Sequence, residues 1–257
     1  ALDYLIKVKG YSFLEAVETI IGHTAIQAPV YEKSQPKEEN KALLHPEKCD
    51  SNRVITEYLF GRGIDFEIIN YCISNDLIFE SLPYHNVVFV GYDEKKEPKY
   101  AAYRSTNKRR IMGDCSGSKK DYSFRLGKEN LEEVHLFECA IDLLSYATLA
   151  KLNGQDWKEM SFVSLSGVYS PAKKMEDSKV PIALEKYLGS NPSVRKIRIH
   201  FDNDIAGRKA AQTLKTILPD KYEIVDEPPK AGKDFNDFLC MRMGIYNKKT
   251  HERNEER

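Results

Sequence analysis

The stretch "VHLFECAIDLLSYATLAKL", residues 134–152, joins two kinds of periodicity. It begins as a short apolar run, which is typical of a buried strand, and continues with apolar residues at the spacing of a helix. Glu138 stands where the strand is expected to end, and Asp142 follows one helical turn later. Because a buried charge is costly, acids at this junction indicate either a functional site or helix caps.

A second stretch repeats the arrangement. In "RKIRIHFDNDIAGRKAAQTL", residues 195–214, an apolar strand ends in Asp202 and Asp204, and another helix follows. Alternation along an extended segment points both aspartates the same way. The carboxyl ends of parallel strands face a common crevice, so we expect these aspartates to meet Glu138 and Asp142 there.

The order of elements around these two stretches favours a parallel sheet. After about residue 131, strands expected at "EVHLF", "SFVSLSG", "KIRIHF" and "YEIVD" alternate with helices expected at "AIDLLSYATLAKL", "PIALEKYLG", "IAGRKAAQTLKTIL" and "DFNDFLCMRM". Such alternation predicts an α/β domain whose small, mostly parallel sheet is covered by helices on both faces.

The upstream half has a different pattern. Residues 51–72 predict a helix, a Gly-Arg-Gly turn and a second helix with Asp65 as its N-cap. The runs "LIFESLP", "NVVFVGYD" and "KYAAYRS" predict three strands of a small antiparallel sheet. We therefore expect an α+β region before the parallel sheet.

Charge and composition exclude some classes of protein. The 257 residues carry 39 Lys and Arg against 39 Asp and Glu, so no global basic field indicates nucleic acid as a partner. No apolar run reaches the roughly 18 residues of a membrane helix. The five cysteines show no zinc-ligand or redox spacing, which predicts reduced thiols in a cytoplasmic protein without a membrane partner.

One local stretch is basic. Between Lys99 and Lys128 there are nine Lys or Arg against two Asp, with aromatic residues interleaved. Such a stretch is either an ordinary solvated loop or a surface that binds phosphates and stacks bases. The candidate nucleotide- or DNA-binding residues in it are Arg104, Arg109, Arg110, Lys119 and Lys120.

The four expected site acids point to a metal. Their charges would repel one another unless a cation lay among them. Oxygen ligands without His or Cys favour Mg²⁺ or Mn²⁺ over zinc. A site of this kind suits phosphoryl or nucleotidyl transfer.

"FECAIDLLS" and the later "IHFDNDIAG" resemble the Toprim domain of DnaG-type primases, topoisomerases and some nucleases. The resemblance implies that Glu138, Asp202 and Asp204 are catalytic metal ligands and that Asp142 is a further catalytic acid. The chain departs from the family pattern at Cys139, where Toprim domains usually have glycine.

The segment "GKDFND", residues 232–237, resembles the end of primase-type Toprim domains. The resemblance implies that Lys233 and Asp234 line the crevice, with Lys233 binding nucleotide or nucleic acid. An ordinary turn with an N-cap is the alternative.

The upstream half adds to the resemblance. "EYLFGRGIDFEIINYCI" is similar to the opening of a primase catalytic core, and "GSKKDYSF" with "FECAIDLLSYATL" is similar to primase-like proteins of conjugative plasmids and transposons. "ALDYLIKVKGYSFLEAVETIIG", expected to form two short helices, resembles the tail that follows a zinc-binding module. Zn²⁺ would then be bound only in a module preceding Ala1.

The domain organisation implied by this resemblance has five parts: a helical tail of a zinc-binding module (1–28), a linker (29–50), an α+β basic primase-type subdomain (51–130), a Toprim domain (131–245) and a charged tail (246–257).

The function implied is a DNA primase-like nucleotidyltransferase core that makes primers in mobile-element replication or transfer. Its partners would be single-stranded DNA template, nucleoside triphosphates and a helicase or relaxase of the same element. A Toprim nuclease and a non-catalytic nucleic-acid-binding module with a vestigial metal site remain as alternatives.

Overall fold

The computed structural model describes residues 2–11, 16, 19–20, 42–167 and 169–245. The chain divides into two units, Ala1–Asn40 and Lys41–Arg257. Among the described residues of the first unit, one of the two expected helices is present as α1 (Leu2–Lys7). Most of the second expected helix and the whole charged tail lie outside the described residues.

The second unit begins with the expected α+β region. Two helices form at the expected turn, and four strands pair antiparallel in the order β1-β2-β3-β4. The elements are α3 (Arg53–Phe60), α4 (Phe66–Ser74), β1 (Ile78–Glu80), β2 (Val87–Tyr92), β3 (Pro98–Arg104) and β4 (Met112–Asp114). The sequence predicted three of these strands. The fourth, β4, lies within the basic stretch, for which the sequence predicted no strand.

The expected parallel sheet is confirmed. Its five strands have the order β5-β7-β6-β8-β9, in which β7, β6, β8 and β9 are parallel and β5 is antiparallel to β7. The strands are β5 (Arg125–Gly127), β6 (Glu133–Phe137), β7 (Ser161–Ser164), β8 (Lys196–His200) and β9 (Glu223–Asp226). The edge strand β5 comes from the segment expected to belong to the upstream subdomain.

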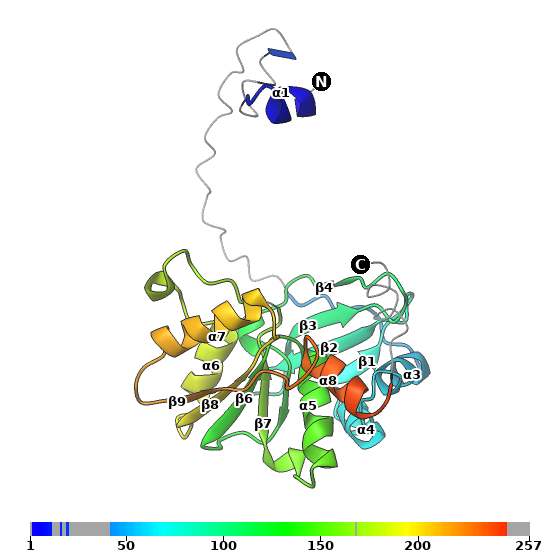
Figure 1. The fold of residues 1–257 in the computed structure, drawn as a ribbon. Coiled ribbons are helices and arrows are strands. Elements are labelled where there is room, and N and C mark those ends of the chain that lie inside the picture. The colour runs from blue at the N-terminus through cyan, green and yellow to red at the C-terminus, as the bar shows by residue number, and fades with distance from the viewer. Residues whose placement is uncertain (1, 12–15, 17–18, 21–41, 168, 246–257) are drawn as a thin grey trace. The chain divides into compact units, whose positions relative to one another are not determined.

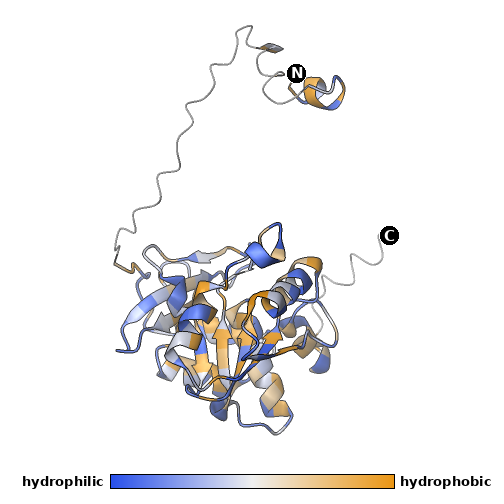
Figure 2. Ribbon diagram, turned by 90° about the vertical axis from the view of Figure 1, so that its left-hand side faces the viewer, coloured by the Kyte–Doolittle hydropathy of each residue, from blue (hydrophilic) through white to orange (hydrophobic). Residues whose placement is uncertain are grey.

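Helices cover both faces of this sheet (Figure 1). They are α5 (Ala140–Leu152), α6 (Ile182–Ser190), α7 (Ile205–Ile217) and α8 (Phe235–Arg242), with short 3₁₀ turns η1 (Lys120–Tyr122), η2 (Trp157–Glu159) and η3 (Met175–Asp177). Alternation along β6 sends Leu136 into a core with α6 and α7, and sends Phe137 into a core with α5 and α8. Figure 2 shows the hydrophobic residues on the strands and the polar ones on the outer loops.

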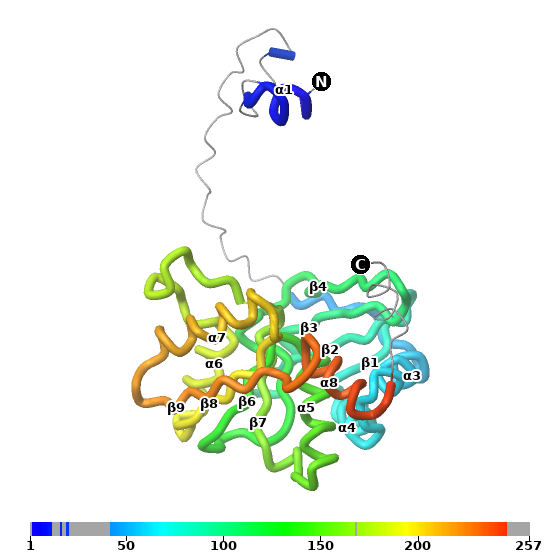
Figure 3. The backbone as a smooth tube through the Cα atoms, viewed as in Figure 1, coloured from blue at the N-terminus to red at the C-terminus, as the bar shows by residue number. Residues whose placement is uncertain are grey.

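The upstream helices share a core with the parallel sheet. Apolar residues of α3 and α4 lie in the same cluster as those of α5 and α8. Helices α5 and α8 run beside each other in Figure 3. The expected N-cap is present: Asp65 accepts a hydrogen bond from the Glu67 N–H at 2.8 Å. Its carboxylate also pairs with Lys151 of α5 at 2.7 Å. The two regions are therefore joined by apolar packing and by ion pairs.

Among the described residues, no helix is long and apolar enough to cross a membrane. All five cysteines are free thiols, as the sequence predicted.

The edge strand β5 depends on a glycine. Gly127 has φ +86°, and a Cβ there would lie 1.9 Å from the carbonyl oxygen of Met160. We expect Gly127→Ala to destabilise the protein by about 3 kcal/mol or more, because the left-handed backbone and the backbone clash both oppose the new methyl group. Urea unfolding measures the change.

Gly154→Ala is the matched control. Gly154 has φ +78° but no atom within 4 Å of the added Cβ, so only the conformational cost of about 1 kcal/mol is expected. Equal losses in the two variants would contradict the clash at β5.

Candidate active site

The first pair of acids meets because their strands are neighbours. Glu138 directly follows β6 and Asp202 follows β8, and β6 pairs with β8 in parallel. The backbone N–H of Asp202 donates to Oε1 of Glu138 at 3.1 Å. The expected convergence of these two strand ends is therefore present, even though the residues lie far apart along the chain.

A glycine makes this approach possible. A Cβ on Gly207 would lie 2.2 Å from the carbonyl oxygen of Asp202 and 2.9 Å from Oε1 of Glu138. The N–H of Gly207 donates at 2.9 Å to Oδ1 of Asp204, which is the N-cap of α7. Asp204 thus caps a helix, as the alternative interpretation held, and its other oxygen, Oδ2, lies within ion-pair distance of Lys233.

The predicted nucleotide-binding residue Lys233 lies among the acids. Its Nζ is 3.1 Å from Oδ2 of Asp202 and 3.3 Å from Oδ2 of Asp204. The bond to Asp202 is the main cause that raises the pKa of Lys233 above its ordinary value. The pKa of Asp204 is lowered, first by the N–H of Gly207 and then by Lys233. Lys233 is therefore the local counter-charge of both aspartates.

Asp142 belongs to a second acidic pair. It is buried on α5, where Oδ1 accepts the N–H of Asn236 at 3.2 Å and Oδ2 accepts the thiol of Cys139 at 2.9 Å. Burial, followed by repulsion from Asp234, raises the pKa of Asp142 to about 7. Burial likewise raises the pKa of Asp234, the N-cap of α8. Asp202 repels both members of this pair as well as Glu138.

The cluster holds more negative charge than Lys233 neutralises. Burial, followed by repulsion from Asp202, raises the pKa of Glu138 to about 7. Oxygen donors with an excess of negative charge fit Mg²⁺ or Mn²⁺. Among the described residues, however, these acids do not bring three ligand atoms within 4.8 Å of one another. These acidic side chains would have to rotate in order to coordinate one ion together.

The departure at Cys139 is compatible with the fold. Its backbone is extended, with φ −138° and ψ 162°, so this position does not need glycine. Burial raises the pKa of the Cys139 thiol well above its ordinary value. The side chain therefore stays protonated and acts as a hydrogen-bond donor to Asp142.

Two of the basic candidates, Arg104 and Lys120, line a cavity at the start of α5. Arg104, at the end of β3, donates from Nε to the Tyr58 hydroxyl at 3.2 Å, and Lys120 lies 3.0 Å from Asp114. Both line a cavity of about 290 Å³ that also reaches Cys139 at the start of α5. The cavity wall is mainly apolar, and Tyr100, Tyr103 and Phe124 contribute to it.

The other basic candidates are placed elsewhere. Arg109 and Arg110 lie exposed in the β3–β4 turn, and Lys119 lies exposed before η1. In the described part of the chain, no ion pair joins these three side chains to the acidic cluster. We call these three exposed residues the outer basic surface, and none of them lines the cavity.

Three polar residues near the acids were not predicted. Asn236 is buried and donates from Nδ2 to the Arg62 carbonyl oxygen at 2.9 Å, which ties α8 to the α3–α4 turn. Arg62 also stacks over Tyr58. Arg208 donates to the carbonyl oxygens of Phe201 and Asp202. Asn236 and Arg62 fall within quoted motifs, whereas Arg208 has no distinguishing local signal.

His200, the last residue of β8, is 1% exposed. Its ring stacks on Phe137 and on His135, and its Nδ1 lies 3.1 Å from the Glu227 carbonyl oxygen. Burial lowers the pKa of His200 well below its ordinary value. It therefore packs behind the acidic cluster as a neutral side chain.

The raised pKa of Glu138 predicts pH-dependent stability. Because its folded-state pKa of about 7 lies above the ordinary 4.5, the stabilisation it gives is present below about pH 4.5 and is lost as pH rises through 7. In chelator-treated protein, Glu138→Gln should be more stable than the parent by about 1–3 kcal/mol at pH 8 and nearly equal at pH 5. Urea unfolding at both pH values measures this. A difference that does not change with pH would contradict the assignment.

Solved structures of primases are similar to this chain at low identity. The primase fragment of the bacteriophage T7 primase-helicase protein is 18% identical with a TM-score of 0.48, covering 72% of this chain and 69% of that chain. The E. coli primase catalytic core is 12% identical with a TM-score of 0.47, covering 79% and 72%. The Aquifex aeolicus primase, with its zinc-binding and RNA polymerase domains, is 15% identical with a TM-score of 0.45, covering 95% and 68%. Similarity at this level supports no conclusion about activity.

Two family models match the chain, and no curated protein does. Residues 57–130 match a family described as a protein of unknown function (DUF3991). Residues 135–239 match the family described as Toprim-like. This second match runs from β6 into α8 and contains the whole acidic cluster and Lys233. Residues 135–239 of this chain therefore have the Toprim fold.

Proposed function

We propose that this chain is the catalytic core of a DNA primase-type nucleotidyltransferase that uses Mg²⁺ or Mn²⁺. The observation that carries the proposal is the acidic cluster at the carboxyl ends of β6 and β8 within a Toprim-like domain. The cavity lined by Arg104 and Lys120 supports it, because that cavity places cations and aromatic rings next to the start of α5.

Glu138, Asp202 and Asp204 would hold the metal, with Asp142 as a further acid behind them. A bound divalent ion polarises phosphate oxygens and stabilises the attacking and leaving oxygens of nucleotidyl transfer. Lys233 contacts both aspartates, so it would orient them and limit their repulsion. Since Glu138 has a pKa of about 7, metal binding would compete with protonation of this carboxyl.

The basic residues would divide between two tasks. Arg104 and Lys120 would bind the triphosphate of a nucleotide whose base lies against the aromatic wall of the cavity. Arg109, Arg110 and Lys119 are exposed and would bind the phosphates of single-stranded template. We further infer a cytoplasmic role in mobile-element replication or transfer beside a helicase or relaxase.

Primer synthesis tests the reaction. With single-stranded DNA, ribonucleotides and Mg²⁺ or Mn²⁺, we expect the chain to make short products, and Glu138→Gln to reduce the rate by about 100-fold or more, because it removes a charged metal ligand. Glu185→Gln, the same change at an exposed site on α6, should leave the rate unchanged. Gel analysis of labelled products measures both.

Other outcomes would favour the alternatives. Metal-dependent cleavage of DNA without nucleotides would indicate a Toprim nuclease. Absence of both activities, together with DNA binding that Glu138→Gln leaves unchanged, would indicate a non-catalytic module. Either result would overturn the primase proposal.

Salt dependence of binding tests the outer basic surface. We expect Arg109→Ala with Arg110→Ala to weaken single-stranded DNA binding uniformly across sequences, and to reduce the slope of log K against log salt by about 0.7 for each lost phosphate contact. Lys221→Ala, at the exposed turn before β9, which is an edge strand of the other sheet, is the control. An unchanged slope in the double variant would exclude this surface. Fluorescence anisotropy measures the binding.

A further inference from the structure

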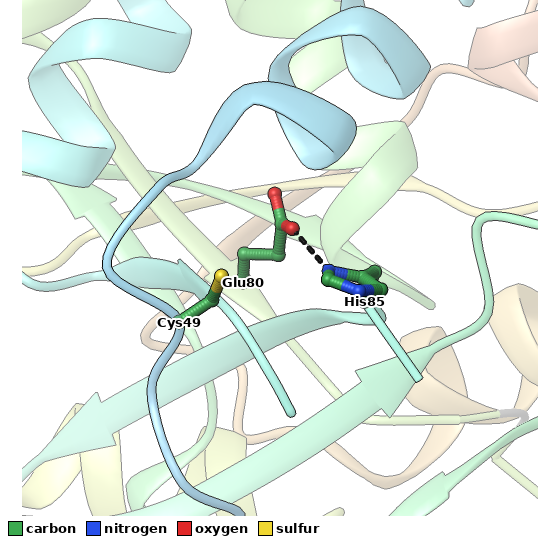
Figure 4. Close-up of side chains that lie close together, drawn as sticks. All are labelled: Cys49, Glu80 and His85. Carbon is green, nitrogen blue, oxygen red and sulfur yellow. Dashed lines mark hydrogen bonds and ion pairs between the residues drawn. The ribbon is translucent and has the colours of Figure 1, made fainter. Parts of the chain in front are cut away.

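Cys49, Glu80 and His85 lie together at the outer edge of the four-stranded sheet (Figure 4). One potential ligand atom from each side chain lies within 4.8 Å of the other two. Among the residues that the structure describes, this is the single group of three or more such side chains. It is formed by the segment before α3, the end of β1 and the β1–β2 turn.

The carboxylate of Glu80 is buried and fixed in orientation. The residue is 2% exposed, and its Oε2 accepts the N–H groups of Val54 and Ile55 at 2.9 and 3.3 Å, at the start of α3. Asn52 also accepts the backbone N–H of Glu80 at 2.9 Å. These contacts hold one oxygen toward the helix and leave the other, Oε1, directed toward His85.

The backbone also positions the other two side chains. The N–H of Cys49 donates to the Glu80 carbonyl oxygen at 2.8 Å, and Lys48 pairs with Ser81 in a β-bridge. His85 has φ 51°, an uncommon conformation for a non-glycine residue, and its Nδ1 lies 2.6 Å from Oε1 of Glu80. The ring is about half exposed, so solvent and ions can reach it.

Positive charge next to this carboxylate is scarce. The nearby ammonium of Lys48 pairs with Asp76 at 2.7 Å, and Arg53 lies 3.8 Å from Glu57. In the described part of the chain, the ion pair recorded for Glu80 is the one with His85. A divalent cation would balance a Cys49 thiolate and a Glu80 carboxylate together, leaving the buried group neutral overall.

We propose that Cys49, Glu80 and His85 form a zinc site, with solvent in the fourth position. Sulfur and imidazole ligands favour Zn²⁺ over Mg²⁺, and one thiolate, one imidazole and one carboxylate are all zinc ligands. On binding, Cys49 loses its thiol proton, and His85 presents Nδ1 to the metal with its ring proton on Nε2. The sulfur ligand makes this site chemically different from the carboxylate cluster at Glu138.

The site would fasten the segment that leads from the first unit onto the sheet. The segment that carries Cys49 contacts the sheet through the Leu44–Ser116 and Lys48–Ser81 bridges. A metal held by Cys49 on one side and by Glu80 and His85 on the other would add a third, stronger link. Metal binding should therefore protect this segment from proteolysis.

Cobalt substitution tests the proposal in the full chain, because cobalt bound to a thiolate gives a sulfur-to-metal charge-transfer band that a carboxylate site cannot give. We expect this band on adding Co²⁺ to chelator-treated protein, its loss on adding Zn²⁺, and a Zn²⁺ affinity reduced by more than about 100-fold in Cys49→Ser and in His85→Gln. Competition with a chromophoric chelator measures the affinity.

Two control variants test whether the cobalt band comes from the proposed zinc site. Cys139→Ser, in the acidic cluster, and His45→Gln, an exposed histidine near Cys49 in sequence, should both keep the cobalt band and the zinc affinity. Circular dichroism of the metal-free variants checks that Cys49→Ser and His85→Gln remain folded. A band absent from the parent, retained in Cys49→Ser, or lost in Cys139→Ser would overturn the site.

Discussion

The parallel pairing of β6 with β8 is the constraint on which the rest of the site depends. In this register Phe137 lies opposite His200. The next residues, Glu138 and Phe201, therefore follow the two strands at the same edge of the sheet. There the backbone N–H of Asp202 reaches the Glu138 carboxylate. A slip of one residue would turn every side chain of a strand to the other face. The side-chain pattern of both strands opposes such a slip, because it would move Leu136 out of the core with α6 and α7 and turn the polar His135 into it.

Charge repulsion follows directly from this pairing. Burial raises the pKa of Glu138 to about 7 and also raises the pKa of Asp142, so both carboxyls are partly protonated near pH 7. The Gly207 N–H, followed by Lys233, lowers the pKa of Asp204 and keeps it ionised. The protein thus concentrates acids at one sheet edge and stabilises them only in part. The excess of carboxylates in this half-buried crevice attracts a cation. When no metal is bound, the same carboxylates lower the stability of the protein at high pH, where they are ionised.

The upstream region contributes to this crevice through packing and hydrogen bonds. Asn236 of α8 holds the Arg62 carbonyl oxygen, and Tyr58 of α3 holds Arg104. The apolar residues of α3 and α4 share one core with α5 and α8. The two segments matched by family models therefore share one core. This shared packing brings Arg104 to the start of α5.

The sequence alone determined the alternation of strands and helices, the N-cap at Asp65 and the acids at two strand ends, because these depend on periodicity and on neighbours in the chain. Tertiary structure decided the rest. Strand β5 joined the parallel sheet across the expected boundary at residue 130, and Lys233 became a counter-ion of Asp202. Cys49, Glu80 and His85 came together without any zinc-ligand spacing. Each of these depends on contacts between distant segments, and local pattern carries no information about which distant segments will meet.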